Sequence, residues 1–249
     1  MERAETIGRN IAAVRARIAA AADRAGRDPA TVTLVAVTKT QPPEAVAAVA
    51  AGVADVGENR VQEAAEKIPL VEVADLRWHL IGHLQRNKAR KAAAIFDLIH
   101  SLDSVRLAET LDRHVAQDTP PHPDGTPRRL PVLLQVNIAG EAQKEGFELS
   151  GGLGNREALP GFWEDVEHIL GLQHLDVRGL MTIAPYVADP EQVRPVFRAL
   201  RELRDELAVR FPAASWQELS MGMTGDFEVA VEEGATLVRV GTAIFGERH

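Results

Sequence analysis

Short apolar runs alternate along the chain with segments whose apolar residues recur at helical spacing. Residues 33–38 are all apolar or β-branched, which is typical of a strand buried on both faces. Residues 44–51, closed by Gly52, have the composition of a helix. The same alternation continues to the end of the chain and predicts strands at residues 33–38, 55–57, 77–81, 96–100, 130–137, 177–182, 216–219 and 237–240.

An amphipathic helix is expected before the first strand. Residues 2–25 place Ile7, Ile11, Val14 and Ile18 on one face, and Gly26 ends the pattern. This helix either covers the bottom of the fold or meets a partner. Further helices are expected at residues 44–51, 58–68, 87–94, 104–117 (with Ser101 or Asp103 near the cap), 162–170, 191–211 and 226–233.

About eight strands alternating with helices are typical of a closed (β/α)8 TIM barrel, here one domain over residues 1–249 with an extra N-terminal helix. A doubly wound open sheet is the competing architecture, but no GxGxxG motif follows the first strand. Residues 118–131 hold five prolines and predict an exposed, poorly ordered connection. Residues 139–161 hold six glycines and predict a long loop.

Composition narrows the class of protein. The net charge of −8 argues against a nucleic-acid surface, and no apolar run is long enough to span a bilayer. The absence of cysteine excludes disulfides and thiolate metal sites, and the histidines lack metal-ligand spacing, so no metal is expected. The N-terminus does not resemble a signal peptide. These features indicate a soluble cytoplasmic protein.

Lys39 stands directly after the first strand, and Pro42 and Pro43 stop that strand. The carboxyl ends of parallel strands are where barrels build their sites, so a long amine is expected at the site. The alternative for this residue taken by itself is a lysine that only reaches solvent. Polar residues also follow the other strands, which favours the first interpretation.

The eighth predicted strand leads into Gly241 and Thr242, where close backbone approach and a hydroxyl favour phosphate binding. Ser220 and Met221 follow the seventh strand and would supply the other half of that loop pair. Arg239 lies within the eighth strand and needs an anion or polar acceptor, or else an internal salt bridge. A glycine turn that merely closes the barrel is the alternative for the loop.

A phosphate pocket opposite a lysine predicts a phosphorylated aldehyde as ligand. An amine attacks a carbonyl in its neutral form, which partial burial favours. Pyridoxal 5'-phosphate (PLP) fits, with Arg239 facing its pyridine nitrogen or its phosphate. His79 is expected to be a packed, hydrogen-bonded residue, and His83 with Gln85 could touch the pocket rim.

Seven motifs, in order from the first strand to the last, resemble the pyridoxal phosphate homeostasis protein family (YggS/PROSC-like), which is related to the alanine racemase N-terminal barrel. They are AVTK at 36–39, GENRVQE at 57–63, WHLIGHLQRNK at 78–88, VNI at 136–138, GLM at 179–181, LSMGM at 219–223 and VRVGTAIFG at 238–246.

The resemblance implies that PLP is held as a Schiff base on Lys39. It implies phosphate contacts at Ser220, Gly241 and Thr242, with Asn59 and Arg239 lining the pocket. Lys144 matches a second lysine of the family that could take PLP transiently. The resemblance also implies that apo PLP-dependent enzymes could be partners; we expect a monomer, with a weak dimer as the alternative.

Departures from the family pattern concern the mouth of the pocket. Thr224 replaces the usual serine and keeps a hydroxyl, residues 147–161 are longer and richer in glycine, and the 183–186 loop is unusual.

Two functions follow from the resemblance. The first is a carrier or regulator of PLP that catalyses no reaction. The second is a racemase-like PLP enzyme, which needs proton-transfer groups on both faces of a carbanion. The related racemases take the second group, a tyrosine, from an additional domain, which we expect to be absent because the chain ends soon after the eighth strand. Tyr186 is the one tyrosine of the sequence; its loop could reach the rim of the site, but a chance surface position is the simpler interpretation. A barrel that binds another phosphorylated ligand is the third alternative.

Overall fold

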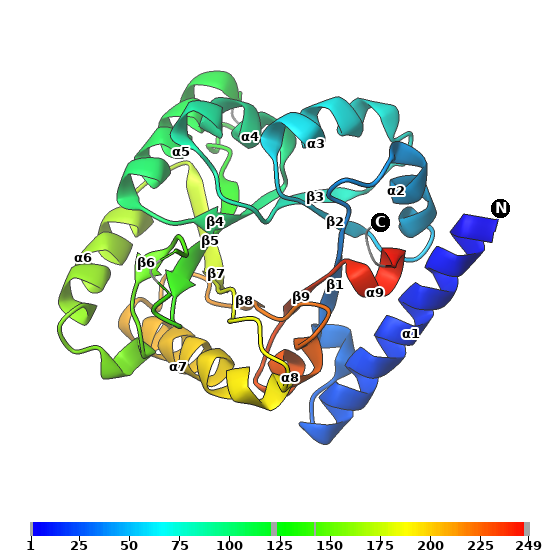
Figure 1. Cartoon of the computed structure of the whole chain (residues 1–249). Helices are drawn as coiled ribbons and strands as arrows, with labels where there is room; N and C mark the ends of the chain where they lie inside the picture. The colour runs from blue at the N-terminus through cyan, green and yellow to red at the C-terminus, as the bar shows by residue number, and fades with distance from the viewer. Residues whose placement is uncertain (1, 121–123, 142, 247–249) are drawn as a thin grey trace.

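The computed structural model describes residues 2–120, 124–141 and 143–246, and it is a closed parallel barrel surrounded by helices (Figure 1). Eight strands run in the order β4-β3-β2-β1-β9-β8-β7-β5, and pairing of β4 with β5 closes the ring. This confirms the predicted (β/α)8 architecture. The barrel strands are β1 (Thr33–Val37), β2 (Asp55–Glu58), β3 (Arg77–Leu80), β4 (Leu98–Leu102), β5 (Leu130–Asn137), β7 (Leu175–Met181), β8 (Glu218–Ser220) and β9 (Leu237–Val240).

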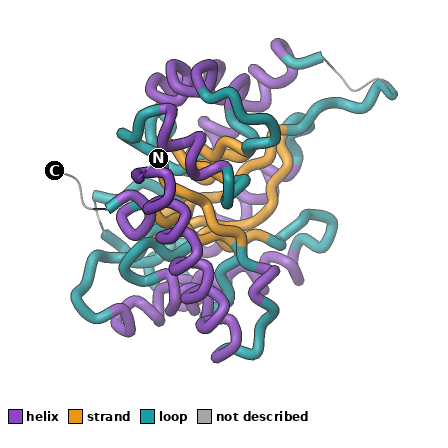
Figure 2. The backbone as a smooth tube through the Cα atoms, turned by 90° about the vertical axis from the view of Figure 1, so that its right-hand side faces the viewer, coloured by secondary structure: helices purple, strands orange, loops and turns teal. Residues whose placement is uncertain are grey.

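The helices form the outer layer and shield one face of each strand from water. They are α1 (Glu2–Arg24), α2 (Pro43–Ala50), α3 (Val61–Lys67), α4 (Ala89–Ile95), α5 (Val105–Asp118), α6 (Leu159–Leu170), α7 (Arg194–Arg210), α8 (Phe227–Glu232) and α9 (Thr242–Phe245). In the view along the side of the molecule, the strands form an inner layer enclosed by these helices (Figure 2). None of the described helices is both long and apolar enough to cross a lipid bilayer.

Two groups of apolar side chains hold the layers together. A large cluster fills the space between strands and helices, where a side chain such as Phe197 is fully buried. A smaller cluster lies apart from it and includes Val35, Leu133 and Met181. Because successive side chains of a strand point to opposite faces, each buried strand contributes to both the barrel interior and the helix layer.

Helix α1 lies in the ring of helices rather than below the barrel. It packs against α2, α8 and α9, and its predicted apolar face, including Ile7, Ile11 and Val14, is buried there (Figure 1). Asn10 Nδ2 donates to the carbonyl oxygen of Ile244 at 2.8 Å, which ties α1 to α9. In the described residues, β9 is followed by the single turn of α9, and α1 packs beside it and extends the helical cover of this part of the barrel.

The segment after β5 differs from the predicted loop over 139–161. Residues Phe147–Glu148 form β6, which pairs in parallel with the end of β5, and α6 begins at Leu159. Phe147 and Leu149 alternate with exposed residues and are buried, which gives this stretch an apolar anchor despite its glycines. Of the predicted proline-rich connection, residues 121–123 lie outside the described part, and residues 124–129 are exposed.

Strand β4 runs two residues later than the predicted 96–100, so Ser101 lies inside it. The backbone N–H of Trp78 donates to the Asp97 carboxylate at 2.7 Å just before the strand begins. The cap of α5 is consequently Ser104, and neither Ser101 nor Asp103: Ser104 Oγ accepts from the N–H of Leu107 at 3.4 Å. The prediction of the cap was wrong because it depended on where β4 ends.

Replacing Ser104 by alanine is expected to lower the free energy of unfolding by about 1 kcal/mol, because one N–H of the first turn of α5 loses its acceptor. Urea unfolding followed by circular dichroism measures the change. Ser104→Asp keeps an accepting oxygen and should remain close to wild type. Equal losses in the two variants would contradict the capping role.

Candidate functional site

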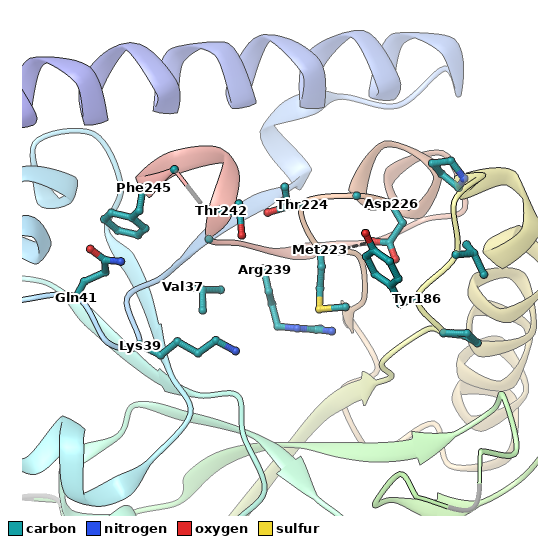
Figure 3. A pocket seen from close by; sticks show the side chains of 16 residues that line it. Val37, Lys39, Gln41, Tyr186, Met223, Thr224, Asp226, Arg239, Thr242 and Phe245 are labelled. Carbon is teal, nitrogen blue, oxygen red and sulfur yellow. Dashed lines mark hydrogen bonds between the residues drawn. The ribbon is translucent and has the colours of Figure 1, made fainter. Parts of the chain in front are cut away.

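A cavity of about 250 Å³ opens at the carboxyl end of the barrel, between the ends of β1 and β9 and the loops that follow β7 and β8 (Figure 3). Four of the residues predicted from the sequence line it: Lys39, Arg239, Gly241 and Thr242. This volume is close to the lower end of the range of about 300–1,000 Å³ that ligand pockets span, so the cavity suits a small molecule.

Lys39 reaches this cavity because of the alternation along β1. Val37 and Lys39 line the cavity, whereas Thr38 between them is fully buried on the other face of the strand. Figure 3 shows the Lys39 side chain extending below Val37 toward the Arg239 side of the cavity. Strand β1 ends at Val37, and Thr40 has a left-handed backbone with φ of 64°, so Lys39 lies in the turn that follows the strand. The amine is thus carried on a sharp turn at the rim of the barrel.

A buried ionic cluster supports that turn from behind. Lys67 Nζ donates to the Thr38 carbonyl oxygen at 2.9 Å, to Glu58 Oε1 at 2.7 Å and to Glu63 Oε1 at 2.9 Å. Thr38 Oγ1 also donates to Glu58 Oε1, at 2.7 Å. Glu58 is fully buried, and this burial raises the pKa of its carboxyl although the bonds from Lys67 and Thr38 act in the opposite direction.

Two threonines and two glycines shape the wall formed by the β8 and β9 loops. Gly222 has a φ of 92°, and a Cβ there would lie 2.6 Å from Ala230 Cβ, so only glycine allows this loop to turn toward the cavity. Gly241 precedes the single turn of α9, and the N–H of Ala243 donates to Thr224 Oγ1 at 3.5 Å. The wall therefore brings the hydroxyl groups of Thr224 and Thr242 and the N-terminal end of α9 to the cavity.

Arg239 forms part of the cavity floor and is 4% exposed. Its Nη1 donates to Ser220 Oγ at 2.5 Å and its Nη2 to the Thr182 carbonyl oxygen at 2.9 Å. Burial lowers the pKa of its guanidinium to about 10, an effect that the Asp226 carboxylate opposes. The arginine thus remains charged at neutral pH. Its side chain is held by two polar acceptors, Ser220 and Thr182, and not by the internal salt bridge that the sequence analysis gave as the alternative.

The other predicted residues, Asn59, Ser220 and Met221, do not line this cavity. Ser220 is fully buried between Arg239 and His100, and Met221 packs in the core of apolar side chains. Asn59 follows β2, and its Oδ1 is buried without a partner among the described residues. A Cβ at Gly82 would lie 2.3 Å from the Asn59 carbonyl oxygen, so this glycine permits close approach of the two loops. Contact of these three residues with a ligand stays a prediction.

Several lining residues were not singled out by the sequence. These are Gln41, Met223, Asp226 and Phe245. Tyr186, which the sequence analysis did consider, also lines the cavity and is fully exposed. Arg3 Nη2 in α1 donates to Gln41 Oε1 at 2.8 Å, so the N-terminal helix reaches the rim. The lining residues come from loops that are far apart in the sequence. Because their meeting depends on the tertiary fold, no local sequence pattern predicts it.

Lys144 and His83 lie outside this cavity. Lys144 Nζ bonds to Glu141 Oε1 at 2.8 Å and to the Ile183 carbonyl oxygen at 3.2 Å. His83 lines a second cavity together with Asp103 and Glu145, and one ligand atom of each of the three lies within 4.8 Å of the others. The prediction that His83 touches the rim of the lysine pocket is not supported, because the β3 and β4 loops form a depression of their own.

His79 is packed and hydrogen-bonded, as predicted. Its Nδ1 lies 2.9 Å from His100 Nε2, and its Nε2 lies 3.0 Å from Asp55 Oδ1. Both histidines are buried. Burial, together with the neighbouring His79 and the charge of Arg239, holds the pKa of His100 well below its ordinary value.

The depressed pKa of His100 predicts a loss of stability in acid. The unfolded chain takes up a proton at this residue near about pH 6.5 and the folded chain does not, so the free energy of unfolding falls by up to about 1.4 kcal/mol per pH unit below that value. Urea unfolding at pH 7.5, 6.5 and 5.5 measures the slope. In His100→Gln, the free energy of unfolding should fall less steeply with decreasing pH, by the contribution of one proton. Equal slopes in the variant and the wild type would contradict the prediction.

The fold and the lysine-bearing site define a barrel of the alanine racemase N-terminal domain class, whose family model matches residues 10–249. The chain is 45% identical over 246 residues to the pyridoxal phosphate homeostasis protein of Pseudomonas aeruginosa, covering 98% of this chain and 96% of the relative. It is 43% identical over 238 residues to the protein of the same name from Aquifex aeolicus, covering 93% and 94%. The chain belongs to the pyridoxal phosphate homeostasis protein family.

Solved structures agree with this assignment. PipY of Synechococcus elongatus, in a structure with PLP bound, has a TM-score of 0.73 at 40% identity and covers 92% of this chain and 100% of that chain. Alanine racemase of Clostridium difficile in complex with cycloserine has a TM-score of 0.71 at 11% identity, covering 100% of this chain and 60% of that chain. The second likeness shows the fold alone.

Proposed function

We propose that this protein binds PLP in the Lys39 cavity, holds it covalently through the Lys39 amine, and acts in intracellular PLP homeostasis as a carrier or regulator of the cofactor. One observation carries the proposal: Lys39, Arg239 and the Gly241–Thr242 turn line a single small cavity. The relatives named above support it, because their names state PLP homeostasis and the PipY structure holds PLP.

The residues present fit this cofactor. PLP supplies an aldehyde that condenses with a primary amine and releases water, and its phosphate carries negative charge. Lys39 supplies the amine, and the N–H groups and hydroxyls around Thr242 and Thr224 suit a phosphate. Arg239 lines the floor of the cavity and would present its charged guanidinium to the cofactor as a hydrogen-bond donor. The buried Oδ1 of Asn59, which has no partner in the described part of the chain, would accept a hydrogen bond from the hydroxyl of the cofactor.

Racemase-like catalysis is the second candidate, since the fold is that of alanine racemase. Racemisation requires a proton donor and an acceptor on opposite faces of the reacting carbon. Tyr186 lines the mouth of the cavity but is fully exposed, so it lacks the packing that would hold a catalytic phenol in place. This exposure favours the carrier over the enzyme.

The carrier function implies a cellular location and partner proteins. We infer a cytoplasmic protein that is a monomer or a weak dimer and that delivers PLP to apo PLP-dependent enzymes. Lys144 is a candidate for transient PLP attachment, because its bond to the Ile183 carbonyl oxygen places it beside the loop that forms the cavity mouth.

Mass spectrometry after borohydride reduction tests the function. The protein is incubated with PLP, reduced and digested, and the expected product is a single adduct on the peptide that contains Lys39. An adduct only elsewhere, or none, would overturn the site. Incubation of the loaded protein with D- and L-alanine decides between the two candidates: sustained racemisation would replace the carrier by the enzyme.

A further inference from the structure

A row of buried polar side chains crosses the barrel and ends at the cavity. It runs from Asp55 in β2 through His79 in β3 and His100 in β4 to Ser220 in β8 and Arg239 in β9. The successive contacts measure 3.0, 2.9, 2.8 and 2.5 Å. All five residues are at most 5% exposed. Only Arg239 among them lines the cavity.

The two ends of this row determine the direction of its hydrogen bonds. A guanidinium only donates, so Ser220 Oγ accepts from Arg239, and a carboxylate only accepts, so Asp55 accepts from His79 Nε2. We assign each imidazole its neutral form, donating with one nitrogen and accepting with the other. Ser220 then donates to His100 Nδ1, and His100 Nε2 donates to His79 Nδ1. Every proton along the row points from Arg239 toward Asp55.

Such a row is costly unless every member is satisfied, because an unpaired buried polar group loses its hydration without replacement. Thr182 contributes its carbonyl oxygen to the second nitrogen of Arg239 at 2.9 Å, and Arg77 pairs with Asp55 at 2.8 Å. Arg239 is therefore fixed at two of its nitrogen atoms by groups that cannot themselves reach the cavity. A flexible arginine would instead lose side-chain freedom whenever a ligand bound.

We propose that Asp55, His79, His100 and Ser220 form a positioning chain that holds Arg239 preorganised as a hydrogen-bond donor at the floor of the Lys39 cavity. The proposal rests on the proposed function, because the ligand that benefits is PLP. His79 and Asp55 become determinants of PLP affinity and of the electronic environment of its ring, although neither lines the cavity. They are positioning residues and not catalytic ones.

The test compares two replacements of His79. Leucine keeps much of the side-chain volume and removes both nitrogens, whereas glutamine keeps one donor and one acceptor and can bridge Asp55 and His100. We expect His79→Leu to weaken PLP binding about tenfold, which corresponds to the loss of one hydrogen bond to a charged group, and to shift the absorption band of bound PLP. His79→Gln should retain most of the affinity and the wild-type band. His168→Gln, at an exposed histidine of α6, is the matched control.

A double-mutant cycle adds a second measurement. Ser220→Ala cuts the row beside Arg239 and should weaken binding at least as much as His79→Leu. If the row acts as a unit, His79→Leu then adds little in the Ser220→Ala background. Should His79→Leu fail to fold, the same comparison is made with Asp55→Asn, which removes the charge and keeps the volume. Independent, additive losses would overturn the proposal.

The outcomes separate this inference from the function it rests on. If the wild-type protein formed no adduct with PLP, that result would overturn the proposed function itself. Wild-type protein that loads normally, alongside folded variants with unchanged affinity and an unchanged absorption band, would overturn only the positioning chain. A lower unfolding midpoint without either change would show that the row serves stability alone.

Discussion

Replacing Lys39 by alanine is expected to abolish covalent retention of PLP. The absorption band of the covalently bound cofactor should disappear, no adduct should survive borohydride reduction and dialysis, and affinity should fall by about a hundredfold or more. The physical reason is that Lys39 contributes an amine on a turn fixed at the rim of the cavity that Arg239 and Thr242 also line. Spectroscopic titration with PLP and mass spectrometry of the reduced protein measure both effects.

Two controls sharpen this experiment. Lys39→Arg keeps the positive charge but cannot condense with an aldehyde, so it should retain weak, non-covalent binding of the phosphate. Lys144→Ala should keep the adduct and the absorption band, because Lys144 lies outside the cavity. If the absorption band persisted in Lys39→Ala and disappeared in Lys144→Ala, the attachment site would instead be Lys144, in the β5–β6 loop. Unfolding midpoints close to wild type confirm that the variants are folded.

Replacing Lys67 by methionine is expected to cost about 3–5 kcal/mol of unfolding free energy, because the buried Glu58 carboxylate would lose its cation. Lys67 is 6% exposed and Glu58 is fully buried. Since Lys67 also donates to the Thr38 carbonyl oxygen, the turn that carries Lys39 should loosen and PLP affinity should fall as well. Urea unfolding and PLP titration measure the two effects in the same preparation.

The partner of Lys67 supplies the decisive control. Glu58→Gln combined with Lys67→Met removes the unpaired charge of the fully buried carboxylate and leaves only that of Glu63, whose side chain is 26% exposed. The double variant should therefore recover a large part of the lost stability. Lys91→Met, at an exposed position of α4, should remain within about 0.5 kcal/mol of wild type. Burial already raises the pKa of Glu58. The defect of the Lys67→Met variant should therefore shrink as the pH falls through the raised pKa, where protonation removes the buried charge. A defect that is unchanged in acid and in the double variant would contradict this account.

The order of elements was readable from the sequence because it depends on local patterns. Buried strands such as β5 and β9 appear as short, largely apolar runs, and their predicted bounds match the structure. Errors arose where bounds depend on a neighbour: β4 begins beyond the contact of Asp97 with Trp78, and β6 exists only because β5 offers an edge. The same dependence displaced the cap of α5 to Ser104.

The positions of Lys39, Arg239, Gly241 and Thr242 at one site followed from the sequence alone, because the alternation of strands and helices predicts a parallel barrel, and a barrel brings all strand ends together. Only the tertiary structure decided what surrounds them. His100 and Ser220 are 120 positions apart and Thr38 and Lys67 are 29 apart, yet both pairs are hydrogen-bonded. Such contacts depend on the register of strands and the packing of helices, which no local pattern encodes. The sequence thus determined which groups meet in the barrel, and the folded chain decided how they are held.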